Sequence, residues 1–135
     1  MTTIVRVSED PVVLDDLVAE FTRPECGAVL TFLGVVRDHA DGKQVASIDY
    51  TCYAEMAEKE LRRVVETVQA RHGVPHVAVL HRVGHLAVGE ASLGVVCASP
   101  HRRETFACGL EIIDEMKKTV PIWKKEIGPD GSHWV

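Results

Sequence analysis

Apolar and polar residues follow two different periods along this 135-residue chain. Alternation at residues 4–7 and 45–53 predicts strands with one buried face, because successive side chains of a strand point to opposite faces. Continuous apolar runs at residues 26–36 and 92–99 are typical of buried strands, and residues 77–83 form a further predicted strand. Strands therefore recur at intervals through the first hundred residues.

Two stretches between these strands repeat their apolar residues at the helical spacing. The first, residues 13–21, follows Asp10 and Pro11, a pair typical of an N-cap and a first helical residue. The second, residues 54–72, is closed by Gly73, which favours the left-handed conformation at a helix end. We expect its buried stripe to consist of Met56, Leu61, Val64, Val65 and Val68.

A third helix is predicted from Pro100 to Thr119, with Ser99 as its N-cap. A Pro-Asp-Gly turn then predicts a hairpin within residues 122–135, and an Asp-Gly turn lies in the polar loop at residues 37–43. Strands and helices are mixed without strict βαβ alternation. We therefore expect an α/β or α+β fold with a largely antiparallel sheet, in a single domain of residues 1–135.

Composition narrows the class of protein. The longest nearly uncharged stretch, residues 26–36, is about half the length of a bilayer-spanning helix, and the N-terminus lacks the basic and apolar pattern of a secretion signal. A net charge of −5 argues against general nucleic-acid binding, which needs clustered cations. We therefore expect no membrane span, no nucleic-acid partner and a cytoplasmic location.

Cysteine and histidine spacing gives no sign of a metal site. The chain has four widely spaced cysteines: Cys26, Cys52, Cys97 and Cys108. They form no C-x-x-C pair and lie in apolar segments, which favours buried, reduced thiols. His81 and His85 are four residues apart, but Gly84 lies between them and is typical of a strand that enters a turn. We expect no metal ligands.

The last 35 residues are richer in cations than the rest and carry six of the 15 basic residues. His101, Arg102 and Arg103 occupy the start of the third helix, where the helix dipole favours acidic residues. With the free backbone N–H groups, these side chains would bind a phosphate or carboxylate. Alternatively, they extend into solvent or pair with Glu104.

Lys117 is a second unusual position on the same helix. At about 100° per residue it falls on the apolar stripe of Phe106, Leu110 and Ile113. Its ammonium group either reaches past the helix end or lies in a partly desolvated pocket, where a lowered pKa would suit a base or nucleophile.

Two other segments hold candidate ligand-binding cations. Lys124 and Lys125 point to opposite faces if their segment is extended, so periodicity does not choose between them. Arg37 ends the FLGVV run and either reaches a ligand or pairs with Asp38 or Asp41. Together with the absence of a catalytic carboxylate pair, these cations indicate chemistry on an anionic small molecule.

Five motifs occur in a fixed order from Gly27 to the end of the chain. They are GAVLTFLGVVRDHADGKQV, IDYTCYAEMAEKEL, HRVGHLAVGEASLGVV, SPHRRETFACGLEIIDEMKK and VPIWKKEIGPDGSHWV. In order and spacing they resemble the MoaE family, the large catalytic subunits of molybdopterin synthase. The combination of HR-x-G-x-L-x-x-G-E, S-x-HR and PIWKKE is highly specific. The resemblance implies an α/β hammerhead fold with an additional antiparallel sheet.

The resemblance also implies an activity and partners. The family transfers sulfur to a cyclic pyranopterin monophosphate and so forms the dithiolene of molybdopterin, in molybdenum cofactor biosynthesis. The sulfur arrives as a thiocarboxylate at the C-terminal glycine of a small ubiquitin-like subunit, and a homodimer of large subunits carries two small ones in a heterotetramer. No cofactor and no metal is implied.

The family motifs assign roles to five residues of this chain. Arg37, His101 and Arg102 match substrate-binding positions, and Lys117 and Lys124 match positions that bind substrate and take part in catalysis. The family thus selects Lys124 over Lys125. A non-catalytic scaffold that binds the small sulfur-carrier subunit is the alternative function, and an unrelated phosphate-binding module is a second alternative.

Overall fold

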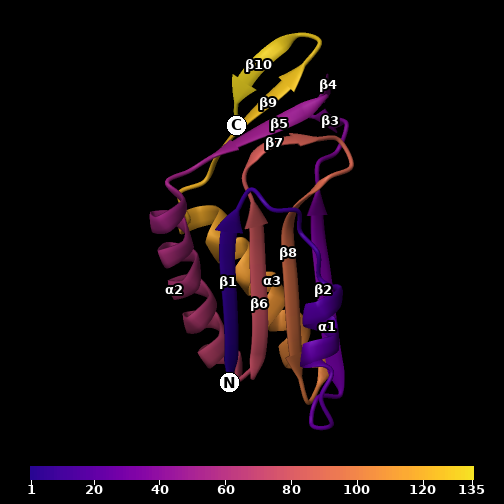
Figure 1. The fold of residues 1–135 in the computed structure, drawn as a ribbon, viewed down its shortest axis with the longest axis vertical. Helices are drawn as coiled ribbons and strands as arrows, with labels where there is room; N and C mark the ends of the chain where they lie inside the picture. The colour runs from indigo at the N-terminus through magenta and orange to yellow at the C-terminus, as the bar shows by residue number, and fades with distance from the viewer.

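A four-stranded sheet forms the centre of the computed structural model, which describes residues 1–135 (Figure 1). Its strands, in spatial order, are β1 (Thr2–Ser8), β6 (His76–Arg82), β8 (Ala91–Ser99) and β2 (Ala28–Val35). β1 runs parallel to β6, while the β6–β8 and β8–β2 pairs are antiparallel. The largely antiparallel sheet expected from the sequence is therefore present, with β1 and β2 at its edges.

Three helices cover this sheet: α1 (Asp15–Phe21), α2 (Ala54–His72) and α3 (Arg102–Thr119). α2 and α3 pack on one face and share the main core with β1, β6 and β8, whereas α1 covers the other face through a smaller apolar cluster (Figure 1). Because both faces are covered, β6 and β8 are buried along almost their whole length, as their apolar runs predict.

A second sheet lies across one end of the first (Figure 1). Its order is β10 (Gly131–Trp134), β9 (Trp123–Gly128), β5 (Ser47–Thr51) and β7 (Gly84–Ala87), all antiparallel. A short hairpin of β3 (His39–Ala40) and β4 (Lys43–Gln44) turns at the predicted Asp-Gly pair, where both residues have positive φ. The predicted C-terminal hairpin is also present, as β9 and β10.

Helix α2 has the bounds that the apolar spacing predicts. It ends at Gly73, which adopts φ 65° and closes the helix. One stripe residue differs: Met56 is 47% exposed, and Ala57 is buried in its place. Ala57 belongs to the main core, which α2 shares with β1 and α3.

The starts of the other two helices differ from the prediction. Helix α1 begins at Asp15 after Leu14, so Asp10 caps no helix, and α3 begins at Arg102 with His101 as its N-cap. Ser99 remains in β8, and its hydroxyl bonds to the carbonyl of His101 and to Thr105. Short capping motifs identify a helix start only to within a few residues.

The main error in the predicted burial concerns strand β2. The sequence predicts a buried strand at residues 26–36, but β2 is an edge strand, and Phe32, Leu33 and Val35 are 39%, 51% and 49% exposed.

No helix of the structure combines the length and apolar character that a membrane span requires.

Candidate functional site

A cavity of about 630 Å³ lies where the two sheets meet at the C-terminal end of α3. Its walls come from the end of β2, from β5, β6, β8 and β9, and from the last turns of α3, and the last residue, Val135, also borders it. Segments far apart in the sequence therefore build one site. This volume falls within the range of small-molecule pockets.

Three basic side chains line this cavity: Arg37 just after β2, Lys117 on α3 and Lys124 on β9. None of them forms an ion pair within the chain, although pairs of Arg37 with Asp38 or Asp41 were one expectation. Three unpaired cations around one cavity produce a positive potential suited to an anionic ligand.

The only acidic side chain of the cavity wall is that of Glu126, and the residue is 5% exposed. It does not neutralise the neighbouring lysines by ion pairing, because its Oε1 atom lies 3.0 Å from Nε2 of His133 on the adjacent strand. The acid is thus held in the second sheet, and the cations remain available to a ligand.

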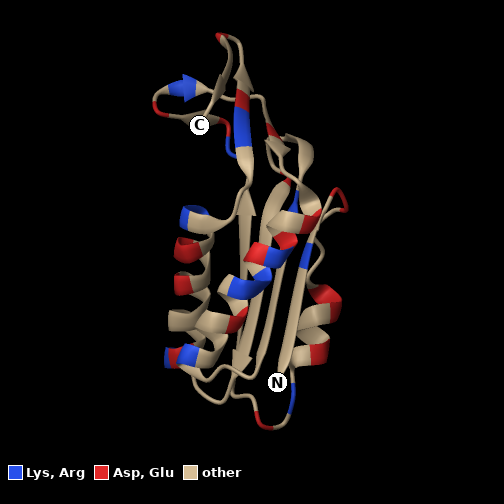
Figure 2. Cartoon of the chain, turned by 90° about the vertical axis from the view of Figure 1, so that its left-hand side faces the viewer, with Lys and Arg blue, Asp and Glu red and all other residues tan.

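Strand geometry separates the two lysines of β9. Lys124 pairs in register with Tyr50 of β5 and lines the cavity, while Lys125 points to the opposite face, with its Nζ atom 5.6 Å from the centre of the Trp134 ring. Figure 2 shows Lys and Arg positions in blue, and one blue segment lies in the second sheet, at the end of the molecule away from the N-terminus. The geometry therefore places in the cavity the lysine that the family motif selects.

Lys117 borders the cavity and its side chain is exposed, so of the two alternatives the partly desolvated amine is the wrong one. The apolar stripe that contains Lys117 faces outward: Phe106 and Leu110 are 61% and 63% exposed. The face of α3 toward the sheet instead carries Thr105, Cys108, Gly109, Ile112 and Met116, which are buried. At Gly109 an added Cβ atom would lie 3.0 Å from Leu30, which shows how closely α3 approaches β2.

His81 is a cavity residue that sequence reasoning missed as a functional candidate. The imidazole is 8% exposed, its Nδ1 atom lies 2.8 Å from the carbonyl oxygen of Arg82, and Tyr50 contacts the ring edge-on. Desolvation by burial lowers its pKa, which keeps the ring neutral near pH 7. With Nδ1–H donating to the carbonyl, Nε2 carries the lone pair. The signal in the sequence was the HR pair at the end of an apolar strand.

His101 and Arg102 do not lie in this cavity. They stand at the opposite end of α3, and the 15 residues from Arg102 to Lys117 correspond to about 22 Å along the helix axis. Both are exposed, and Arg102 forms no ion pair. Glu104 reaches back to the backbone N–H of His101 at 2.8 Å, and bonds from backbone N–H groups lower the pKa of Glu104. One chain thus carries two separate basic sites.

Comparison with known proteins identifies the family. The family model described as MoaE protein matches residues 7–119. The chain belongs to the MoaE family. A MoaE relative from Homo sapiens, named molybdopterin synthase catalytic subunit, is 35% identical over 131 residues, which cover 97% of this chain and 70% of that protein. A Pyrococcus abyssi protein of the same name is 37% identical over 122 residues, which cover 90% of this chain and 82% of that protein.

Solved structures share the MoaE fold. Molybdopterin synthase from Staphylococcus aureus superposes with a TM-score of 0.90 at 29% identity, covering 97% of this chain and 96% of that one. The MoaE protein from Burkholderia ambifaria superposes with a TM-score of 0.82 at 35% identity, covering 100% of this chain and 89% of that one. At 17% identity, a chain from a Helicobacter pylori complex of subunits 1 and 2 of molybdopterin-converting factor shows the same fold, with a TM-score of 0.76.

These findings confirm the family and the mixed α/β fold with an additional antiparallel sheet. The roles of the five MoaE site residues stay predictions. The structure brings three of them together, Arg37, Lys117 and Lys124, and places His101 and Arg102 elsewhere.

Proposed function

We propose that this chain is the catalytic subunit of a molybdopterin synthase. In the proposed reaction, sulfur passes from the C-terminal thiocarboxylate of a small ubiquitin-like subunit to a cyclic pyranopterin monophosphate, and two transfers form the dithiolene. The protein is then a sulfurtransferase of the cytoplasm that works as a homodimer carrying two small subunits. Four free cysteines are consistent with a reducing compartment.

The observation that carries this proposal is the cavity with three unpaired cations inside a MoaE-family fold. A pterin monophosphate and a thiocarboxylate are both anions, and Arg37, Lys117 and Lys124 offer them charge-assisted hydrogen bonds. No cysteine lines the cavity. This supports a route in which the sulfur comes from the partner's acyl group and not from a persulfide of this chain.

A homodimer explains how His101 and Arg102 reach the same substrate. β2 is an edge strand with three exposed apolar residues, and the exposed Phe106 and Leu110 lie on the helix that packs against it. Contiguous apolar surface of this kind is typical of an interface between subunits. A second copy is therefore the proposed cover of this edge.

The two-fold symmetry of such a dimer would bring the basic start of α3 in one chain close to the cavity of the other chain. With a two-fold axis near the middle of β2, the two β2 strands run antiparallel, and the start of each lies beside the end of the other. Ala28, at the start of β2, pairs with Ser99, which lies three residues before Arg102, the first residue of α3. The partner's basic helix start therefore comes next to Val35 and Arg37 at the cavity.

The proposed roles follow from this arrangement. Arg37 and, from the second copy, His101 and Arg102 hold the substrate phosphate, with the helix N-terminus contributing its dipole. Lys117 lies where the thiocarboxylate meets the substrate carbon and stabilises the oxyanion that develops, and Lys124 supports the same charge.

His81 has a place in the second half of each transfer. In the first half, the thiocarboxylate sulfur bonds to the substrate carbon, and an oxygen substituent of that carbon leaves with its bonding electron pair. An acyl–sulfur bond then still joins substrate and carrier. Water attacks the acyl carbon, the sulfur leaves with the bonding electron pair, and the carrier's glycine becomes a carboxylate. The neutral Nε2 atom of His81 accepts the proton of that water.

Reconstitution tests the function. The purified chain is mixed with a thiocarboxylated small subunit and the pterin monophosphate, and the dithiolene product is measured. We expect product with the thiocarboxylate and none with the same subunit ending in an ordinary carboxylate. A chain that binds the small subunit but forms no product would be the scaffold alternative, and one that binds phosphate without the subunit would be an unrelated module.

A further inference from the structure

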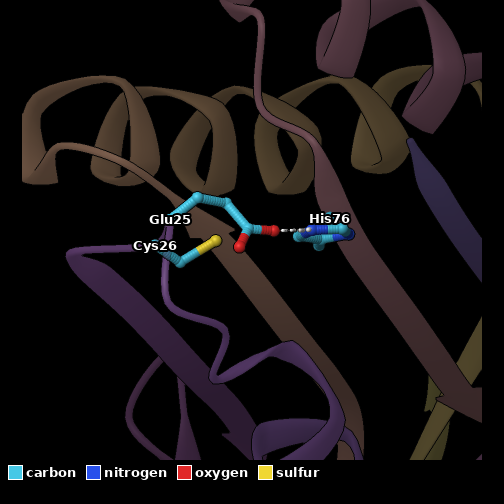
Figure 3. Close-up of side chains that lie close together, drawn as sticks. All are labelled: Glu25, Cys26 and His76. Carbon is cyan, nitrogen blue, oxygen red and sulfur yellow. Dashed lines mark ion pairs between the residues drawn. The ribbon is translucent and has the colours of Figure 1, made fainter.

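Three metal-binding types of side chain meet far from the cavity, at the other end of the large sheet. Glu25 and Cys26 belong to the loop between α1 and β2, and His76 is the first residue of β6 (Figure 3). One donor atom from each residue lies within 4.8 Å of the others. His81, which borders the cavity, lies near the opposite end of the same strand, so this cluster is distinct from the candidate active site.

His76 is the unusual member of the cluster. Its side chain is 6% exposed and stacks on Phe21, yet neither ring nitrogen forms a hydrogen bond. Nδ1 is buried without a partner, and Nε2 faces Oε1 of Glu25 at 3.8 Å, which is too long for a hydrogen bond. Buried polar groups are nearly always satisfied, so the Nδ1 atom of His76 is an exception, and its Nε2 atom faces the carboxylate and the thiol without a hydrogen bond to either.

The charges around the cluster suit a cation. The carboxyl group of Glu25 sits beside the thiol of Cys26, whose pKa is raised by burial first and by Glu25 second. Arg23 is the nearby positive charge, and its Nε atom donates to the carbonyl oxygen of Glu20 at 3.2 Å. A bound cation would compensate the carboxylate and the thiolate together.

We propose that Glu25, Cys26 and His76 bind one divalent cation of the zinc class, with water as the fourth ligand. One sulfur, one imidazole nitrogen and one carboxylate oxygen form a donor set that suits Zn²⁺ and does not suit Ca²⁺ or Mg²⁺. Binding releases the thiol proton to solvent, and His76 coordinates through Nε2 as the neutral ring. The Nε2 atom then gains a partner, while the buried Nδ1 atom stays without one.

The distances are close to those that zinc requires. Zinc–ligand bonds of 2.0–2.3 Å place the donors of a tetrahedral site roughly 3.3–3.6 Å apart. The 3.8 Å between Glu25 and His76 is near this value, and the widest pair must close by about 1 Å. Glu25, whose side chain is 58% exposed in a loop, has room to make that movement.

Such a site would fasten the α1–β2 loop to β6 and so hold the base of the edge strand β2. It is a structural site, because it lies away from the cavity and leaves the cavity residues unchanged. The inference does not rest on the proposed function, and either can fail alone.

Titration with Co²⁺ as a probe tests the site in the reduced full-length protein. We expect one Co²⁺ per chain, a sulfur-to-cobalt charge-transfer band in the near ultraviolet, and loss of the band when Zn²⁺ is added. Cys26→Ser should abolish the band, whereas Cys52→Ser, which changes another partly buried cysteine, should keep it. No band in the wild-type protein, or a band that survives in Cys26→Ser, would overturn the proposal.

A surface variant covers the case in which a cysteine change harms folding. Glu25→Gln alters an exposed side chain, and we expect it to weaken Zn²⁺ binding about tenfold or more, measured by competition with a chelating dye. Zn²⁺ should also raise the melting temperature of the wild-type protein and of Cys52→Ser more than that of Glu25→Gln. Equal affinity and equal melting shifts in all three proteins would show that the cluster does not bind the metal.

Discussion

Mixed dimers give the sharpest test of a site shared between two chains. Arg102→Ala removes a cation at the start of α3, and Lys117→Ala removes one about 22 Å further along the same helix. If each site takes Lys117 from one chain and Arg102 from the other, a dimer of one Arg102→Ala chain and one Lys117→Ala chain contains one intact site and one doubly altered site. After random exchange of equal amounts, half of the dimers are mixed, so about a quarter of the wild-type activity should return.

The assay measures dithiolene product at a precursor concentration below KM, so that the binding loss in Arg102→Ala also lowers the rate. Each variant alone should be close to background, and the 1:1 mixture should rise with the rate of subunit exchange. The control mixes Lys117→Ala with Lys124→Ala, whose altered residues line the same cavity of one chain. That mixture should stay at background. Recovery in the control, or none in the test pair, would refute the shared site.

Three further predictions concern single positions. Lys124→Ala should lower turnover about 10²-fold or more, whereas Lys125→Ala, on the opposite face of β9, should leave product formation near wild type. Gly128→Ala should destabilise the fold by about 1–3 kcal/mol in urea unfolding, because the added Cβ atom would lie 2.1 Å from a backbone carbonyl oxygen of β4. His81 has a lowered pKa when folded, so the unfolded chain binds more protons, and stability should be lost as the pH falls below about 6.5. The decrease in urea midpoint between about pH 7.5 and 5.5 should therefore be smaller in His81→Gln, and an unchanged decrease would show that His81 is not its source.

The elements of the fold were largely predictable because their signals are local. Helix α2 has a buried apolar stripe along most of its 19 residues and a closing glycine, and both turns with Asp-Gly pairs form where they were expected. Burial was less predictable. An apolar run such as that of β2 is compatible with a central strand and also with an edge strand that a second chain covers. The sequence alone does not give the strand order that would decide between them.

The site was predictable in its residue types and less so in its geometry. Lys117 stood out by helical phase, but the phase does not say which of two apolar stripes of α3 faces the sheet. The small residues Cys108 and Gly109 decide it, because they allow close approach to β2 and β8. His81 was missed because its importance arises from contacts between strands that are far apart in sequence. The cluster of Glu25, Cys26 and His76 was invisible to spacing rules for the same reason.

One feature of α3 links the fold to the proposed chemistry. Its outward stripe of Phe106, Leu110 and Lys117 would be unfavourable on an isolated chain, since two large apolar side chains lie in water. The same stripe is favourable if a second copy covers its apolar part and its lysine borders a cavity beside that copy. The start of α3 and its last turns then each carry basic residues, too far apart for one substrate to contact both within one chain. In the dimer, the basic start of one α3 lies beside the cavity of the other chain. The exposed stripe and the divided site thus have a single physical explanation.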